Sequence, residues 1–178
     1  MYGAICIKTN ITMPYSLAVK NKTKWFVDTY GDGIAKAIRG TNLYFPTVVA
    51  QKALESGWGE SSLAKNDFNF GGIKCAPSLA GVVGCVTKDT TEYIGGKKRY
   101  VKRSFSKFKD VEAGIRATVE VLMKDRYADA RNKATSAKDQ VLRIAKAGYT
   151  TTPATKYLDS LSGILEATQD YTGLGRIK

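Results

Sequence analysis

The segment between Pro46 and Gly57 constrains the fold more than any other part of the chain. Proline suits the first turn of a helix and glycine suits its end, so we expect a helix from Pro46 to about Ser56. Its main apolar stripe consists of Val49, Ala50, Ala53, Leu54 and Gly57. A second stripe, at spacing i, i+3 and i+7, consists of Val48, Gln51 and Glu55. The pattern predicts a largely buried helix with Glu55 near its C-terminal end, off the main apolar face.

Helical patterns also lie on both sides of this segment. Apolar spacing predicts a helix over residues 22–39, and we expect Gly31-Asp-Gly33 to break it into two pieces. Three further helices are predicted: one capped by Asp110, a short one that ends at Gly148, and a last one that starts near Pro153. Most of the chain is therefore expected to be helical.

Residues 66–109 have a different character, because glycine and β-forming residues are frequent there. Gly95-Gly96 suits a hairpin turn, and residues 100–108 are typical of the returning strand. The pattern predicts an α+β fold in which a mostly helical body carries a small antiparallel β-lobe, about 70–109, with a cleft between them. A chain of 178 residues fits one domain, which we place at 22–178, after an irregular segment 1–21.

The chain contains no histidine, and this absence limits its chemistry. It excludes Ser-His-Asp and Cys-His catalysis and zinc bound by histidine. Two carboxylates facing one cleft remain as natural machinery, and glycoside hydrolysis uses such a pair. The acid must keep its proton near neutral pH, which requires partial burial. Glu55, on a buried helix beside Trp58, is the best candidate.

The net charge of +12, from 28 basic and 16 acidic residues, predicts anionic partners such as nucleic acid, anionic membranes or bacterial cell wall. No segment approaches the roughly 20 apolar residues of a membrane span. Residues 1–8 lack the basic start and cleavage site of a signal peptide, so the sequence indicates no export route.

The three cysteines cannot all pair within one chain. Cys75 and Cys85 flank a glycine-rich segment, and a bridge between them would contribute roughly 2–3 kcal/mol. The sequence leaves open whether this bridge forms. Cys6 is then expected to be a free thiol, and three cysteines are too few for a usual zinc set.

Several motifs resemble those of the peptidoglycan glucosaminidases, glycoside hydrolase family 73. The most specific is Gln-Lys-Ala-Leu-Glu-Ser-Gly-Trp-Gly-Glu-Ser-Ser-Leu-Ala at residues 51–64, followed by Asn-Phe-Gly-Gly-Ile-Lys at 69–74. Residues 104–108, Ser-Phe-Ser-Lys-Phe, and 147–153, Ala-Gly-Tyr-Thr-Thr-Thr-Pro, support it by order and spacing. The similarity covers roughly 22–168. It departs from the family pattern in the extra glycine at 71–72 and in Thr152, which stands where an aspartate is common.

This resemblance implies a lysozyme-like fold and hydrolysis of the N-acetylglucosaminyl-β-1,4-N-acetylmuramic acid bond of peptidoglycan. It implies that Glu55 is the general acid and that Glu92, on the expected hairpin, is the second carboxylate. Glu92 would activate water, or the 2-acetamido group of the substrate would attack while a carboxylate orients it. Substrate contacts are expected from Trp58, Tyr149, Gln51 and Asn69, with no metal or cofactor.

Other functions remain open at this point. The same fold cuts the other glycosidic bond in muramidases and lytic transglycosylases, and a domain of this kind can also bind cell wall without catalysis. The basic run 97–109 contains three aromatic residues, which is typical of nucleic-acid binding, but strand alternation puts them on both faces. We therefore expect peptidoglycan and anionic wall polymers as partners, not nucleic acid. We expect a monomer acting at the cell wall, periplasmic or extracellular, and a phage origin is compatible with the sequence.

Overall fold

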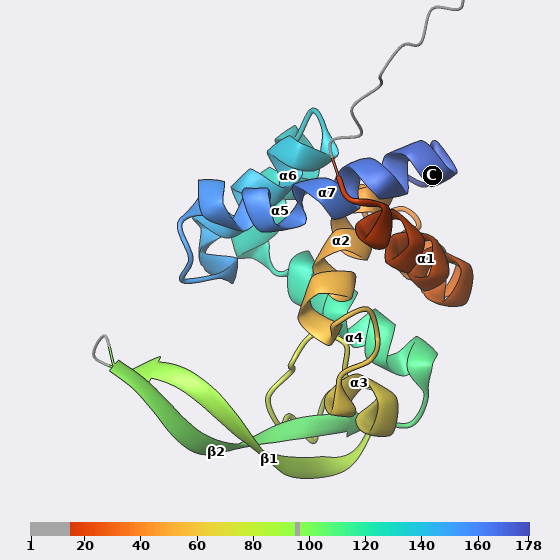
Figure 1. Ribbon diagram of the computed structural model, residues 1–178. Helices are drawn as coiled ribbons and strands as arrows, with labels where there is room; N and C mark the ends of the chain where they lie inside the picture. Colours follow the sequence, from red (N-terminus) through yellow and green to blue (C-terminus); the bar gives the residue numbers. More distant parts are fainter. Residues whose placement is uncertain (1–14, 95–96) are drawn as a thin grey trace, which may run out of the picture.

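The computed structural model describes residues 15–94 and 97–178, and for residues 91–94 and 98 it describes the backbone alone. A helical body lies above a long, curved β-hairpin, which confirms the predicted α+β architecture (Figure 1). The elements in chain order are α1 (Leu17–Ile38), α2 (Phe45–Ser56), α3 (Ser62–Asp67), β1 (Val82–Ile94), β2 (Lys97–Phe108), α4 (Val111–Met123), η1 (Asp125–Tyr127), α5 (Ala128–Lys133), α6 (Ala137–Ile144), η2 (Ala145–Tyr149) and α7 (Ala154–Thr172).

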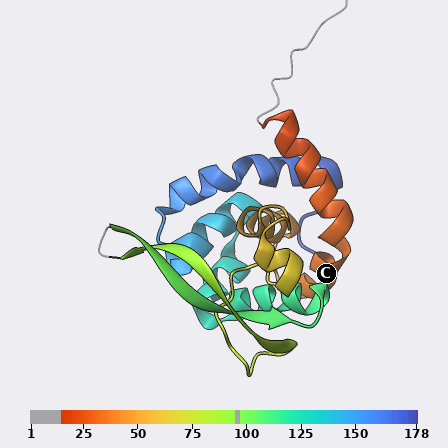
Figure 2. The same ribbon diagram turned by 60° about the horizontal axis from the view of Figure 1, so that its bottom comes forward.

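Helix α2 is the centre of the body, as its sequence predicts. Pro46 lies in its first turn, and Gly57 ends it with a left-handed backbone at φ 58°. Ten of its twelve residues are buried. It packs against α1, α6 and α7, and in Figure 2, which looks nearly along α2, the other helices surround it. A side chain at the end of α2 is therefore held by a rigid, enclosed element.

Helix α1 differs from the prediction in two ways. It is continuous across Gly31 and Gly33, so the expected break is wrong. Both glycines lie where a side chain would be crowded, because a Cβ at Gly31 would lie 3.2 Å from Val27 Cγ1 and one at Gly33 would lie 3.3 Å from Ile115 Cδ1. The helix also begins at Leu17, so residues 17–21 are not irregular; the Ser16 hydroxyl caps it by accepting a hydrogen bond from the Val19 amide.

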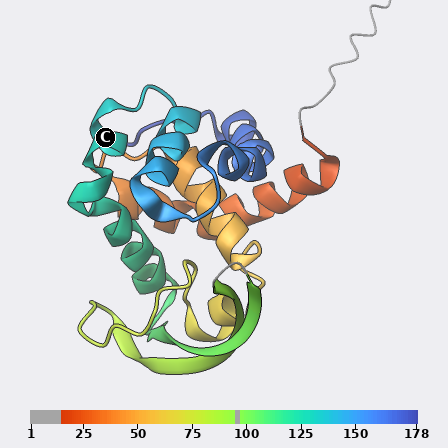
Figure 3. The ribbon, with the colours of Figure 1, turned by 90° about the vertical axis from the view of Figure 1, so that its left-hand side faces the viewer.

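The β-lobe is a two-stranded antiparallel hairpin that curves beneath the body (Figure 3). Its register pairs Val82 with Phe108 and Ile94 with Lys97, with an irregularity between Val82 and Gly84. The predicted turn at 95–96 lies outside the described residues. The strand begins at Lys97 and not at residue 100.

Several contacts tie the hairpin to the rest of the chain, among them a disulfide, an ion pair and an apolar cluster. The Cys75–Cys85 disulfide is present and joins the loop before β1 to the strand. The Lys88 ammonium lies 3.1 Å from the Asp67 carboxylate at the end of α3. Phe108 is buried in a small second core with residues of α4, Ala113 and Ala117. The lobe is thus fixed at its base, next to the C-terminal end of α2. Cys6 lies outside the described residues.

The caps of the later helices follow the sequence. Asp110 accepts a hydrogen bond from the Ala113 amide at the start of α4, and α7 begins directly after Pro153. The short elements α3, η1 and α5 were not predicted, because helices of three to six residues carry too little periodicity. No helix among the described residues combines the length and the apolarity needed to cross a bilayer.

Candidate active site

Glu55 lies in the last turn of α2 and borders a pocket of about 340 Å³. Its side chain is 22% exposed, so the carboxylate is open to a ligand. The walls come from α2, the loop before β1, α4, η1 and η2. The residues that line the pocket are Lys52, Glu55, Gly71, Ile73, Lys74, Thr118, Val121, Tyr127 and Tyr149.

Tyr149 holds one oxygen of this carboxylate. Gly148 has φ 83° and ends the α6–η2 segment, and the turn brings the Tyr149 hydroxyl to Glu55, where it donates a hydrogen bond to Oε1 at 2.5 Å. Burial, and then the negative charge of Glu55, raises the pKa of Tyr149 well above its usual value of 10. The hydroxyl therefore keeps its proton and acts as a donor toward Glu55. The structure thus brings together two predicted site residues that are 94 positions apart.

Lys52 forms an ion pair with the other oxygen of the Glu55 carboxylate, and the sequence analysis did not predict this residue as part of the site. Its ammonium lies 2.9 Å from Glu55 Oε2 and 3.3 Å from the Tyr149 hydroxyl. Its side chain is 1% exposed, and it is the one buried lysine among the residues whose side chains are described. The available signal was a single lysine inside an apolar helix, one turn before Glu55, because lysine is rarely buried without a partner.

Gln51 and Tyr157 support the site from behind. Gln51 is fully buried, and its amide donates to the Tyr157 hydroxyl at 3.2 Å. Burial, and then the charge of Glu55, raises the pKa of Tyr157, so this hydroxyl also stays protonated. Gln51 therefore has no exposed surface for a ligand in this conformation.

Asn69 is likewise buried, with 1% exposure. Its amide group donates to the carbonyls of Ile73 and Ser106 at 2.9 and 2.8 Å, and its carbonyl accepts from the Ile73 amide at 2.9 Å. The two bonds to Ile73 close the loop before β1 on itself, and the bond to Ser106 joins this loop to β2. Asn69 therefore shapes the pocket wall that carries Ile73 and Lys74.

The other two predicted residues lie apart from the Glu55 pocket or are described only in part. Glu92 lies in β1 opposite Arg99, and only its backbone is described. Trp58 lines a different pocket of about 400 Å³, together with Trp25 of α1. The Lys22 ammonium lies 5.1 Å from the centre of the Trp58 ring.

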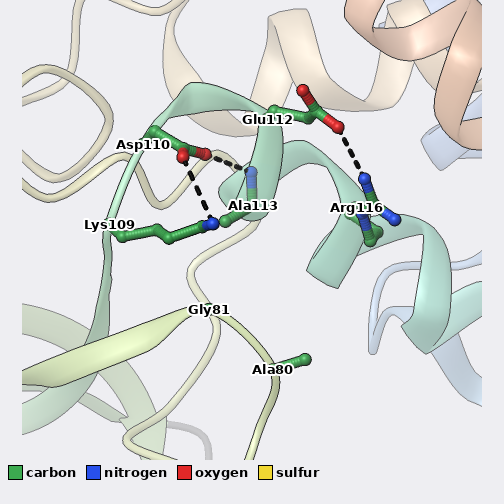
Figure 4. A pocket seen from close by; sticks show the side chains of 7 residues that line it. All are labelled: Ala80, Gly81, Lys109, Asp110, Glu112, Ala113 and Arg116. Atoms are coloured by element: carbon green, nitrogen blue, oxygen red, sulfur yellow. Dashed lines mark hydrogen bonds and ion pairs between the residues drawn. The ribbon is translucent and has the colours of Figure 1, made fainter.

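A hollow of about 350 Å³ at the start of α4 also contains carboxylates (Figure 4). Glu112 lies 2.6 Å from Arg116, and Asp110 caps α4 and lies 3.8 Å from Lys109. These side chains are also more than half exposed, which suits charged surface pairs better than an acid that must hold a proton. The Glu55 pocket is thus the better candidate for acid chemistry.

Residues 31–170 match the model of a family described as mannosyl-glycoprotein endo-β-N-acetylglucosaminidase. The chain belongs to this glucosaminidase family. The match contains α2 and every element that lines the Glu55 pocket, and it confirms the family resemblance carried by residues 51–74.

The glucosaminidase domain is similar to curated proteins named peptidoglycan hydrolase FlgJ. The Salmonella typhimurium protein is 32% identical over 124 residues, which cover 67% of this chain and 38% of that protein. The Pseudomonas aeruginosa protein is 32% identical over 129 residues, covering 70% of this chain and 31% of that protein. The chain thus spans less than two fifths of these relatives.

Two solved structures of peptidoglycan or glycoside hydrolases are similar to this chain. A C-terminally truncated glycoside hydrolase domain of Salmonella typhimurium FlgJ has a TM-score of 0.64 and 26% identity, covering 84% of this chain and 99% of that one. A peptidoglycan hydrolase mutant from Sphingomonas sp. A1 has a TM-score of 0.68 and 26% identity, with the same coverage. The lysozyme-like fold of the glucosaminidase domain is therefore confirmed.

Proposed function

We propose that this domain hydrolyses the glycan strand of bacterial peptidoglycan at the N-acetylglucosaminyl-β-1,4-N-acetylmuramic acid bond. The observation that carries the proposal is the Glu55 carboxylate, which borders a polar pocket at the end of a buried helix and accepts a hydrogen bond from Tyr149. The family match supports the glucosaminidase bond, and the names of the relatives support peptidoglycan as the polymer.

In this proposal Glu55 is the general acid. Its proton passes to the glycosidic oxygen as that bond breaks, and the Tyr149 hydroxyl orients the carboxyl group. Glu92, on β1, is the second carboxylate. In one alternative Glu92 takes a proton from the water that attacks the sugar. In the other, Glu92 orients the 2-acetamido group of the substrate, and the oxygen of that group attacks instead of water. Trp58 and Trp25 would contact sugar units farther along the strand.

The setting is the bacterial cell wall, in the periplasm or outside the cell. The net charge of +12 favours binding to the wall's anionic groups, and β2 contributes to it because no acidic residue lies between Lys97 and Lys109. Binding to walls should therefore weaken as salt rises. Two of the three aromatic residues in that run, Phe105 and Phe108, are at least 92% buried, so they are not available to stack on nucleic-acid bases.

The test is digestion of purified peptidoglycan by the wild type and by Glu55→Gln, with fragments identified by mass spectrometry. Wild-type fragments should end in N-acetylglucosamine at the reducing end, and Glu55→Gln should lose at least 10²–10⁴-fold in rate, because it lacks the acid. Glu112→Gln is the matched control, since it removes an exposed carboxylate that is already paired with Arg116.

Each other outcome has a distinct meaning. Fragments ending in N-acetylmuramic acid would identify a muramidase, and anhydro ends a lytic transglycosylase. Wild-type rates in Glu55→Gln would reject Glu55 as the acid. Glu92→Gln should lose much of the activity if Glu92 activates water, whereas a mild loss would favour attack by the acetamido group.

A further inference from the structure

A buried lysine contacts the carboxylate that the reaction needs in its protonated form. The ammonium of Lys52 lies 2.9 Å from Glu55 Oε2, and its side chain is 1% exposed. Gly71 leaves room for it, because a Cβ at that position would lie 3.3 Å from Lys52 Nζ. A positive charge at this distance, on a side chain that is itself buried, attracts a carboxylate strongly.

We propose that Lys52 is a positioning residue for the hydrolysis: its ammonium fixes the Glu55 carboxyl group and stabilises the carboxylate that remains when the proton has left. Lys52 does not need to touch the substrate in this role. It holds Glu55 Oε2 while Tyr149 holds Oε1, and it stabilises the negative charge that appears on Glu55 as the proton moves to the leaving oxygen. The inference rests on the proposed function, because it assumes that Glu55 is the acid.

Most of the other groups around Glu55 are uncharged. Three are tyrosines: Tyr149 of η2, Tyr157 of α7 and Tyr127 of η1. Burial raises the pKa of Tyr149 and of Tyr157, and tyrosine is uncharged at acid and neutral pH. Lys74, from the loop before β1, is a second cation that lines the pocket, and its ammonium lies 4.3 Å from the centre of the Phe105 ring. Among the residues whose side chains are described, Lys52 is the cation paired with Glu55.

The test is the pH profile of kcat/KM for the wild type, Lys52→Met and Lys52→Arg, measured on peptidoglycan fragments. The descending limb of that profile reports loss of the catalytic proton in the free enzyme. In Lys52→Met the limb should move to higher pH, because the positive charge beside Glu55 Oε2 is gone. The plateau at low pH should fall by roughly tenfold, because the negative charge that develops on Glu55 has lost its stabilising partner.

These two changes separate the proposed role from a structural one. A variant that merely packs poorly would lower the plateau and leave the limb in place. Lys52→Arg keeps the charge and should keep the wild-type limb. Lys138→Met is the matched control, because it removes a lysine from an exposed ion pair with Glu166, and it should change neither the limb nor the plateau.

An unchanged limb in a folded, active Lys52→Met enzyme would overturn the proposal. If Lys52→Met does not fold, Lys52→Gln carries the same expectation, because it keeps a donor and removes the charge. If the wild type does not cleave peptidoglycan, the proposed function fails instead, and the electrostatic coupling of Lys52 and Glu55 is still measurable by unfolding.

Discussion

Replacing Glu55 with glutamine leaves the Lys52 ammonium buried without its counter-charge, and we expect this to cost more stability than replacing Lys52. Removing one partner of a buried pair typically costs 3–5 kcal/mol. The Lys52 side chain is 1% exposed and that of Glu55 is 22% exposed, so water reaches the pair only from the Glu55 side. We therefore expect Glu55→Gln to lower the free energy of unfolding by about 3 kcal/mol, the lower end of that range.

Lys52→Met is expected to behave differently. The remaining carboxylate keeps contact with solvent and with the Tyr149 hydroxyl, and the cost of burying an ammonium disappears. Methionine has a volume similar to that of lysine, so we expect Lys52→Met to change the free energy of unfolding by no more than about 1 kcal/mol. The double variant should then resemble Lys52→Met, which gives an interaction free energy of about 2–3 kcal/mol.

Urea unfolding under oxidising conditions, followed by the fluorescence of Trp25 and Trp58, measures these differences. The slope of unfolding free energy against urea should stay constant across the four proteins. In thermal unfolding, 3 kcal/mol corresponds to a decrease in Tm of about 6–12 °C for a chain of this size. Equal losses in the two single variants, or losses that simply add in the double variant, would refute the reasoning.

Three further predictions concern the fold and its pH dependence. Gly114→Ala should destabilise the folded protein by about 1–3 kcal/mol or more, because the added Cβ would lie 1.8 Å from the Phe68 carbonyl oxygen. Gly84→Ala is the control in the same urea titration and should have little effect, because no atom lies within 4 Å of the added Cβ. The Cys75→Ser/Cys85→Ser variant should lose about 3 kcal/mol, and reducing agent should destabilise the wild type but not this variant. Hydrogen bonding to Asp170 raises the pKa of Tyr15 to about 12. The hydrogen bond therefore contributes fully to the free energy of unfolding below about pH 10, and this contribution is lost as pH rises toward 12. Urea unfolding at about pH 9 and pH 12 should show the loss of stability, and Tyr15→Phe should make that loss smaller.

The sequence predicts those parts of the fold that depend on local signals. Pro46, Gly57 and Asp110 specify helix ends by their own backbone or side-chain chemistry, and the structure confirms each. The break at Gly31 was wrong for a physical reason: the local cost of a glycine in a helix is only about 1 kcal/mol. Packing of α1 against α2 and α4 outweighs it, and that packing is not visible in the local sequence.

The site could be predicted only in part, for a similar reason. Glu55 follows from its place on a buried helix and from the motif around it. The contact with Tyr149 joins positions 94 apart and needs the fold itself. The motif also included Gln51 and Asn69, and the structure buries both behind the pocket, because their amides satisfy polar groups of neighbouring elements. Sequence motifs thus indicated a candidate site without separating residues that line the pocket from residues that lie behind it.

The unfolding and kinetic experiments on Lys52 must agree with each other. Glutamine at position 55 has nearly the same shape and charge as protonated glutamic acid, so the Glu55–Lys52 interaction free energy also estimates how strongly Lys52 opposes the protonated acid. A favourable interaction in unfolding therefore requires the limb of kcat/KM to move to higher pH in Lys52→Met. A strong interaction in unfolding with an unmoved limb would mean that another group, with Glu92 the first candidate, controls the pH dependence.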